Sequence, residues 1–209
     1  MQNILGFLSK GGIIMYPLFL CSIAALAVAI EKAIALRRRK IIIPEVVAVL
    51  ENVKAPNDFG LAVSICEKHH GPLANVVRIS LENPGLPREE LKEALLDQGR
   101  QEVHQLERGL GVLETVAGIA PLLGLLGTVL GILKVFKVIA DLGVGQAAAL
   151  AGGISEALIT TIAGLFIGIP ALVAYNYFAH KAEALVLEIE KYSNRLLARI
   201  GAIHDAPRG

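Results

Sequence analysis

The sequence predicts an all-α integral membrane protein with three transmembrane helices and long helical extensions on one side of the bilayer. Hydrophobic residues make up 54% of its 209 residues, charged residues only 19%, and the charged ones are missing from long windows. Three such windows, 11–30, 115–133 and 157–179, each reach the roughly 18 to 20 residues that a helix needs to cross a bilayer. Since no run of alternating β-branched and polar residues occurs, no strand is predicted.

Basic residues predict the orientation of these helices, because Lys and Arg concentrate on the inner side of a membrane. One lysine, Lys10, precedes the first window, whereas eleven Lys and Arg residues lie between 37 and 108. None lies in 142–155, and five lie between 181 and 208. The N-terminus is therefore expected outside and the C-terminus inside. The basic cluster at 37–40 follows the first window, which indicates a retained anchor rather than a signal peptide.

Helix-breaking residues divide the inner segment into helices. Pro44, Pro72 and Pro87 each occupy a helix start, and Asn57 or Asp58 caps a further helix. The helix after Pro87 is expected to run into the membrane and to pack against an inner extension of the third spanning helix. The predicted order is an outer N-terminal segment (1–12), transmembrane helix 1 (13–36), a cytoplasmic helical domain (37–114), transmembrane helix 2 (115–140), an outer loop (141–152), transmembrane helix 3 (153–179) and a cytoplasmic helical tail (180–209).

Composition argues against several functions. A net charge of +1 and the lack of a basic cluster interleaved with aromatic residues disfavour nucleic-acid binding. Two cysteines, one expected in the membrane and the other in the cytoplasm, disfavour a disulfide. Cys66, His69 and His70 have ligand-like spacing, but without two further ligands nearby no metal site is expected. Ser155 has no histidine in any span to serve as its base, so no serine hydrolase and no enzyme are expected. The glycine pattern at 143–148 is similar to a dinucleotide-binding turn, but no strand precedes it, so no cofactor is expected.

Glu156 is expected within the first turns of the third spanning helix, which is predicted to start near Gly153. A charge at the centre of a span costs about 2.5 to 3.5 kcal/mol on insertion scales, so such residues are functional candidates. The alternative is that Glu156 caps the helix start, where the helix dipole favours a negative charge. Both interpretations stay open at this point. Lys134 and Lys137 lie at the outer end of the second helix and are expected to reach the interface through their long side chains.

Three threonines add polar groups to the last two windows. Thr160 and Thr161 follow Glu156 by about one turn, and Thr128 lies near the middle of the second helix. At 1.5 Å per residue, Thr161 lies roughly 12 Å from its helix start and Thr128 roughly 18 Å from its helix end, so they could share one layer. Their hydroxyls can line a hydrated path or bond back to a helix carbonyl. One chain offers too few polar atoms for a pore, so a conduit requires several subunits or another protein's helix.

Small residues and prolines in the same windows predict close packing and helix bends. Glycines four residues apart let two helix backbones approach, and proline removes a backbone donor. These residues are Pro121, Gly124, Gly127 and Gly131 in the second window and Gly164, Gly168 and Pro170 in the third.

Both windows closely resemble the ExbB/TolQ/MotA proton-channel family. The resemblance is carried by Ala117-Gly-Ile-Ala-Pro-Leu-Leu-Gly-Leu-Leu-Gly-Thr-Val-Leu-Gly-Ile and by Gly153-Ile-Ser-Glu-Ala-Leu-Ile-Thr-Thr-Ile-Ala-Gly-Leu-Phe-Ile-Gly-Ile-Pro-Ala. It extends over the whole topology. The three-span layout and Glu156 resemble the ExbB/TolQ branch more than the four-span flagellar branch.

The resemblance implies a bacterial inner-membrane stator in which five copies form a ring. Its second and third helices would line a pore that holds the spanning helices of an ExbD- or TolR-like partner dimer, with a TonB- or TolA-like protein beyond and phospholipids around. Protons crossing on a partner aspartate would drive work on the envelope. Thr128, Thr161 and Glu156 match pore-lining positions, whereas Thr160 stands where many relatives carry Ala. The resemblance leaves the role open between ExbB-type transport, TolQ-type envelope maintenance, gliding and a passive scaffold. It also leaves open whether the ion is a proton or sodium.

Overall fold

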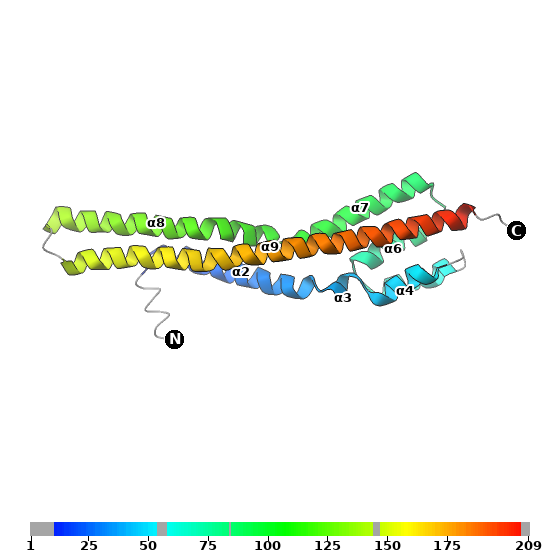
Figure 1. Ribbon diagram of the computed structural model, residues 1–209, viewed down its shortest axis with the longest axis horizontal. Helices are drawn as coiled ribbons and strands as arrows, with labels where there is room; N and C mark the ends of the chain where they lie inside the picture. The colour runs from blue at the N-terminus through cyan, green and yellow to red at the C-terminus, as the bar shows by residue number, and fades with distance from the viewer. Residues whose placement is uncertain (1–10, 54–57, 84, 144–146, 206–209) are drawn as a thin grey trace. The chain divides into compact units, whose positions relative to one another are not determined.

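A computed structural model of the chain describes residues 11–53, 58–83, 85–143 and 147–205. Within these ranges every regular element is a helix, which confirms the all-α prediction. Lys10, Asn57 and most of the predicted outer N-terminal segment lie outside the described residues. The helices are α2 (Met15–Ala35), α3 (Arg38–Ile41), α4 (Pro44–Asn52), α5 (Phe59–Lys68), α6 (Pro72–Glu82), α7 (Arg88–Glu107), α8 (Leu110–Leu142) and α9 (Ala147–Asp205) (Figure 1).

Three helices among the described residues are long and apolar enough to cross a membrane. These candidate spans are Met15–Ala35, Leu110–Asp141 and Leu150–Ala202, and an 18-residue window of each has a mean hydropathy of 2.1, 2.2 and 2.2, respectively. Large apolar side chains project outward from them, including Phe136, which is 65% exposed, and Phe166, which is 79% exposed. Such surfaces are tolerated where lipid or another protein covers them. The prediction of three spanning helices is therefore supported by length and composition.

The chain divides into two compact units. The first, here called the membrane unit, contains Met1–Glu31 and Gly109–Tyr177 and therefore the uncharged windows except for the last two residues of the third. The second, here called the helical unit, contains Lys32–Arg108 and Phe178–Gly209.

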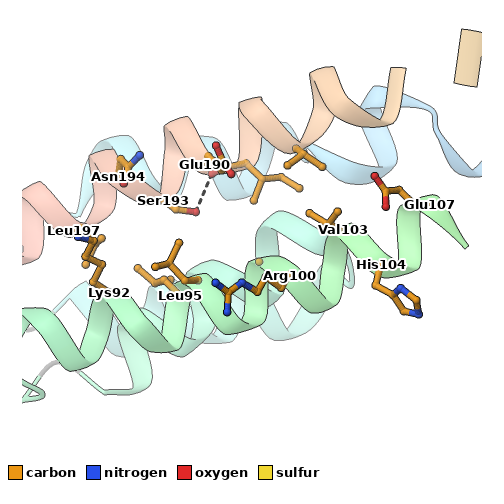
Figure 2. Close-up of a pocket in the computed structure, with 14 residues that line it drawn as sticks. Lys92, Leu95, Arg100, Val103, His104, Glu107, Glu190, Ser193, Asn194 and Leu197 are labelled. Carbon is orange, nitrogen blue, oxygen red and sulfur yellow. Dashed lines mark hydrogen bonds between the residues drawn. The ribbon is translucent and has the colours of Figure 1, made fainter. Parts of the chain in front are cut away.

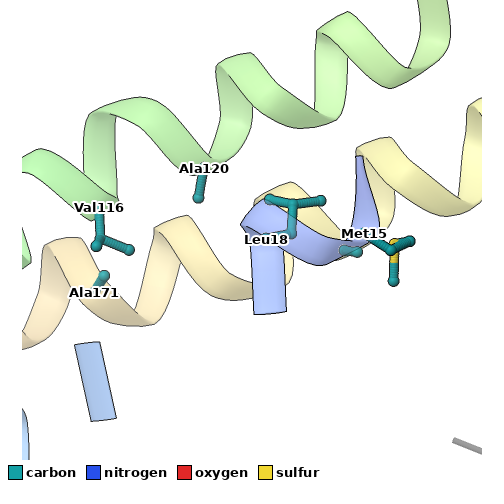
Figure 3. Close-up of a cluster of buried hydrophobic side chains, with 6 residues drawn as sticks. Met15, Leu18, Val116, Ala120 and Ala171 are labelled. Carbon is teal, nitrogen blue, oxygen red and sulfur yellow. The ribbon is translucent and has the colours of Figure 1, made fainter. Parts of the chain in front are cut away.

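The membrane unit is built on a close pairing of α8 with α9, to which the start of α2 adds a third helix. Met15 and Leu18 of α2 pack in one apolar cluster with Val116 and Ala120 of α8 and with Ala171 of α9 (Figure 3). Leu18 and Ala120 are fully buried. Small side chains predominate on the α8 and α9 sides of this cluster because the two backbones approach closely.

Glycines make that approach possible. A Cβ atom added to Gly164 would lie 2.5 Å from the carbonyl oxygen of Ala120 and 3.0 Å from the Cα atom of Gly124. One heptad along α8 and one heptad back along α9, a Cβ atom on Gly131 would lie 2.7 Å from that of Ala157. The matching heptad steps show that α8 and α9 run antiparallel with a constant register.

The two prolines of the spans lie inside continuous helices. Pro121 is within α8 and Pro170 is within α9. A Cβ atom on Gly168 would lie 2.7 Å from both Cγ and Cδ of the Pro121 ring. Gly168 therefore makes the room that the Pro121 ring needs at the contact between the helices.

Two predicted helix boundaries are wrong. The helix after Pro87 does not run unbroken into the membrane, because α7 ends at Glu107 and Gly109 has a φ of +89°. This left-handed conformation strains any residue with a Cβ atom and ends a helix. The third spanning helix begins at Ala147 rather than near Gly153, so Glu156 lies nine residues inside it.

Buried apolar residues and a few polar contacts hold the helical unit together. Leu73, Val76 and Val77 of α6 are almost completely buried. Glu102 of α7 is 2% exposed, and its carboxylate accepts hydrogen bonds from the Asn75 amide at 2.9 Å and the Gln98 amide at 2.6 Å. Both donors give the buried carboxyl group hydrogen-bond partners, without which its burial would oppose folding.

Arg38 and Glu188 connect the start of the helical unit to α9. The guanidinium group donates from Nε at 2.9 Å and from Nη2 at 2.7 Å to the two carboxylate oxygens. This bidentate hydrogen bonding lowers the pKa of the Glu188 carboxyl and raises the pKa of Arg38. The lowered pKa means that the contribution of Glu188 to stability is present at neutral pH and is lost as the pH falls through that value.

α7 and the C-terminal part of α9 line a cavity of about 510 Å³ in the helical unit (Figure 2). The two helices that were expected to pack together thus both contribute side chains to the wall of one cavity. Figure 2 shows charged side chains of both signs around the cavity, among them Lys92, Arg100 and Glu107 from α7 and Glu190 from α9.

The close α8–α9 contact predicts that Gly164→Ala destabilises the protein by about 1 to 3 kcal/mol, the usual cost of overpacking a tight contact. The new Cβ atom would meet backbone atoms of Ala120 and Gly124, which cannot rotate away. The measurement is the thermal stability of the purified protein in detergent. Gly152→Ala, in the same helix with nothing within 4 Å, is the control and should show no such loss. Equal stability of the two variants would contradict the close contact.

Burial of Cys66 predicts a slow reaction of its thiol with alkylating reagents. Cys66 is 3% exposed, and burial raises its pKa to about 11. Since the pKa of an unfolded cysteine is about 8.5, the neutral thiol favours the folded state most below that pH, and this contribution is lost as the pH rises through about 11. Alkylation at pH 8.5 followed by peptide mass spectrometry should modify Cys66 far more slowly than a cysteine placed at Gly60, an exposed position on the same helix. Comparable rates would show that Cys66 is accessible.

Candidate functional site

Thr128 of α8 and Thr161 of α9 form a layer of hydroxyl groups between the two helices of the membrane unit. Their Oγ1 atoms share a hydrogen bond in which either can donate. Thr128 Oγ1 also lies 3.2 Å from the Ala157 carbonyl oxygen, and Thr161 Oγ1 lies 3.1 Å from that of Gly124. The expectation that the two threonines share one layer is confirmed. This hydroxyl layer, Thr128 with Thr161 and the carbonyls of Gly124 and Ala157, lies within windows that are otherwise apolar.

The hydroxyl layer can exchange partners without leaving a polar group unsatisfied. Each hydroxyl carries one hydrogen, whereas Thr128 has three acceptors within reach, because its own-helix carbonyl at Gly124 lies 3.3 Å away. Both side chains are half-buried. A hydroxyl that rotates between acceptors can also solvate a passing proton or cation.

Thr160 faces α8 and packs against it. It is fully buried, and a Cβ atom on Gly127 would lie 2.5 Å from the Cβ atom of Thr160. Its hydroxyl donates to carbonyls of its own helix, at Ala157 (2.8 Å) or Glu156 (3.2 Å). The structure therefore places Thr160 in the helix contact beside the hydroxyl layer, and its role in a proton pathway stays a prediction.

Glu156 forms an ion pair with Lys134 across the α8–α9 contact. The Lys134 Nζ atom lies 2.5 Å from Glu156 Oε1, and the two side chains are 58% and 22% exposed. The alternative that Glu156 caps the start of its helix is wrong, because α9 begins at Ala147. The Lys134 side chain is directed to a carboxylate of the neighbouring helix. Contact with the membrane interface is therefore not the only interaction that can stabilise its charge.

Sequence reasoning missed this pairing, although the helix register could have revealed it. Lys134 follows Thr128 by six residues, and Glu156 precedes Thr161 by five. If two antiparallel helices bring Thr128 to Thr161, the same register brings Lys134 close to Glu156. The signal was therefore present once the threonines were placed in one layer.

The hydroxyl layer contains no group that can hold a proton near neutral pH. Windows 115–133 and 157–179 contain no Asp, Glu, Lys, Arg or His. Threonine hydroxyls and peptide carbonyls accept and donate hydrogen bonds without a change of charge. Proton transfer at this depth therefore requires a titratable group from outside these two windows.

The described residues contain no cluster that could hold a metal ion, since no three His, Cys, Asp or Glu side chains come together in them. α5 ends at Lys68, so His69 and His70 lie beyond the helix that carries Cys66. Residues 144–146, which belong to a glycine pattern similar to a dinucleotide-binding turn, lie outside the described ranges.

Comparison with known proteins places the chain in a family. The MotA/TolQ/ExbB proton channel family matches residues 68–191, more than half of the chain. The chain is similar to a biopolymer transport protein ExbB homolog of Methanothermobacter thermautotrophicus, with 30% identity over 190 residues, 90% of this chain and 67% of that protein. It is similar to ExbB-like protein 3 of Synechocystis, with 30% identity over 94% of this chain and 95% of that protein.

A third similarity concerns the Tol-Pal system protein TolQ of Pseudomonas aeruginosa. The identity is 44% over 86 residues, which are 41% of this chain and 37% of that protein. Together with the three apolar helices, these similarities fit an inner-membrane protein. The chain belongs to the MotA/TolQ/ExbB proton channel family.

Proposed function

We propose that this chain is the ring-forming subunit of a stator of the ExbB–ExbD or TolQ–TolR type, which converts the proton-motive force into mechanical work on the cell envelope. The work would energise transport across the outer membrane. The observation that carries the proposal is the hydroxyl layer of Thr128 and Thr161 between two candidate spanning helices. Both threonines lie within the residues that match the proton channel family.

The chemistry of the hydroxyl layer supports a division of work between two proteins. The layer offers hydrogen-bonding groups without a titratable one, so a single-span partner of the ExbD or TolR kind would bring an intramembrane aspartate. Several copies of this chain, five by resemblance to the family, would surround a partner dimer, with a TonB- or TolA-like protein receiving the motion. The chain would perform no covalent chemistry and would be no enzyme.

The distribution of basic residues supports an N-terminus on the outer side and a C-terminus inside, with 37–108 in the cytoplasm. The 59 residues of α9 would then continue from the membrane into the cytoplasm as one helix. TolQ-type envelope maintenance or gliding would use the same ring. A passive scaffold is the alternative outside this class, and it would use the glycine contact without needing the hydroxyl layer.

The hydroxyl layer predicts that Thr128→Val or Thr161→Val lowers proton flux by at least about tenfold, which corresponds to about 1.4 kcal/mol in the barrier. Valine keeps the shape of threonine and removes the hydroxyl, so assembly should persist. The measurement is proton flux into liposomes that contain the complex with its co-purified partner. Thr115→Val is the control, because that hydroxyl is exposed and bonds only to Gly111 of its own helix at 2.7 Å. Full flux in both layer variants would favour the scaffold.

The missing titratable group predicts that the chain alone does not conduct protons. Liposomes with the purified chain should show proton flux near the protein-free background. Liposomes with the complex should show proton flux, and this flux should be lost when the partner's intramembrane Asp is replaced by Asn. Chemical cross-linking of the partner-free protein checks that it is still an oligomer. Flux from the chain alone at the level of the complex would contradict the division of work.

A further inference from the structure

The ion pair of Lys134 with Glu156 lies on the same two helices as the hydroxyl layer. At 1.5 Å per residue, Lys134 is about 9 Å along α8 from Thr128, and Glu156 is about 7.5 Å along α9 from Thr161. We propose that Lys134 is a positioning residue for ion translocation, because it holds and neutralises the Glu156 carboxylate at the outer end of the hydroxyl layer. This inference rests on the proposed function.

The pair stands at the edge of the uncharged part of the membrane unit. Lys134 directly follows the window 115–133, and Glu156 directly precedes the window 157–179. With a side chain that is only 22% exposed, an unpaired Glu156 carboxylate would lose much of its hydration without compensation. An ammonium group 2.5 Å away supplies that compensation.

A second segment confines the same carboxylate. Gly12, just before α2, has a φ of +68°, and a Cβ atom built on it would overlap Glu156 Oε1. Oε1 is also the atom that accepts the hydrogen bond from Lys134. The carboxylate is therefore held between α8 and the turn that leads into α2, with little freedom to change rotamer.

The backbone at Glu156 and Ala157 accepts hydrogen bonds both from Thr160 and from the hydroxyl layer. The Glu156 carbonyl accepts from Thr160 Oγ1 at 3.2 Å, and the next carbonyl, at Ala157, accepts from Thr128 Oγ1 at 3.2 Å. A shift of the Glu156 side chain that moved its backbone would therefore reach Thr128 through the Ala157 carbonyl. Through this connection Lys134, by holding Glu156, can influence the position of Thr128 in the proposed ion pathway.

The position of Lys134 predicts a specific pattern of transport by the partner-bound complex in liposomes. Lys134→Met should lower proton flux by about tenfold, whereas Lys134→Arg, which keeps a cation, should stay within about twofold of the native complex. Because Lys134 acts through Glu156, the flux of the double variant Lys134→Met with Glu156→Gln should lie within about twofold of the flux of Glu156→Gln alone. The matched control is Lys137→Met, which removes an exposed lysine three residues further along α8.

Infrared spectroscopy of the same complexes, with glutamate labelled by ¹³C, reports the pair without reference to flux. The native-minus-Glu156→Gln difference spectrum assigns the Glu156 carboxylate band. That band should shift in Lys134→Met and stay in place in Lys134→Arg and Lys137→Met.

The possible outcomes separate the two proposals. An unchanged carboxylate band in Lys134→Met would overturn the ion pair. The positioning role would be overturned by unchanged flux in Lys134→Met or by loss of the assembled complex. It would also be overturned if Lys134→Met lowered the flux equally in the native and in the Glu156→Gln background. A native complex without proton flux would overturn the proposed function, and the transport role of Lys134 with it, even where the band shifts as expected.

Discussion

The close approach of α8 and α9 is the constraint on which the rest of the membrane unit depends. Threonine has a short side chain, so the hydroxyls of Thr128 and Thr161 meet only where the two backbones nearly touch. Gly124 and Gly164 provide that approach, since any Cβ atom on Gly164 would overlap backbone atoms of α8. Close packing through small residues and the hydroxyl layer are therefore two results of one contact.

Polar groups remain tolerable in this contact because each has a partner. Among the residues that the structure describes, no buried side-chain nitrogen or oxygen atom lacks a hydrogen bond. In an apolar surrounding an unsatisfied hydroxyl is costly, so the carbonyls of Gly124 and Ala157 stabilise the two threonines as much as they orient them. Because the partners include carbonyls already used in the helices, the hydroxyls can exchange acceptors without breaking either helix.

Most of the architecture could be predicted from charge-free windows and helix spacing, because both are local properties of the sequence. Counting residues from the assumed helix ends left a shared layer of Thr128 and Thr161 possible, although it gave the two residues unequal depths. The assumed start near Gly153 is six residues too late, which is also why the position of Glu156 within its helix was misjudged. Gly153 stays helical with Val135 of α8 beside it, whereas Gly109 adopts a positive φ and ends a helix. Sequence alone does not show which glycine stays helical because a neighbouring helix packs against it and which glycine ends a helix.

The Lys134–Glu156 pair shows a second kind of information that local patterns lack. Each residue alone looked like an exception: a lysine on the outer side of the membrane, and a glutamate inside a span. That the two charges neutralise each other can be inferred only from the antiparallel register of α8 and α9. This register follows from glycine contacts spaced one heptad apart. Under the proposed function, the ring would thus supply oriented hydroxyls and a neutralised carboxylate, and the titratable group would come from the partner. A proton-binding group carried by the partner can move relative to the ring, whereas one fixed within the α8–α9 contact would keep the same surroundings throughout a cycle. This physical difference favours a pathway in which the charge that binds the proton belongs to the moving protein.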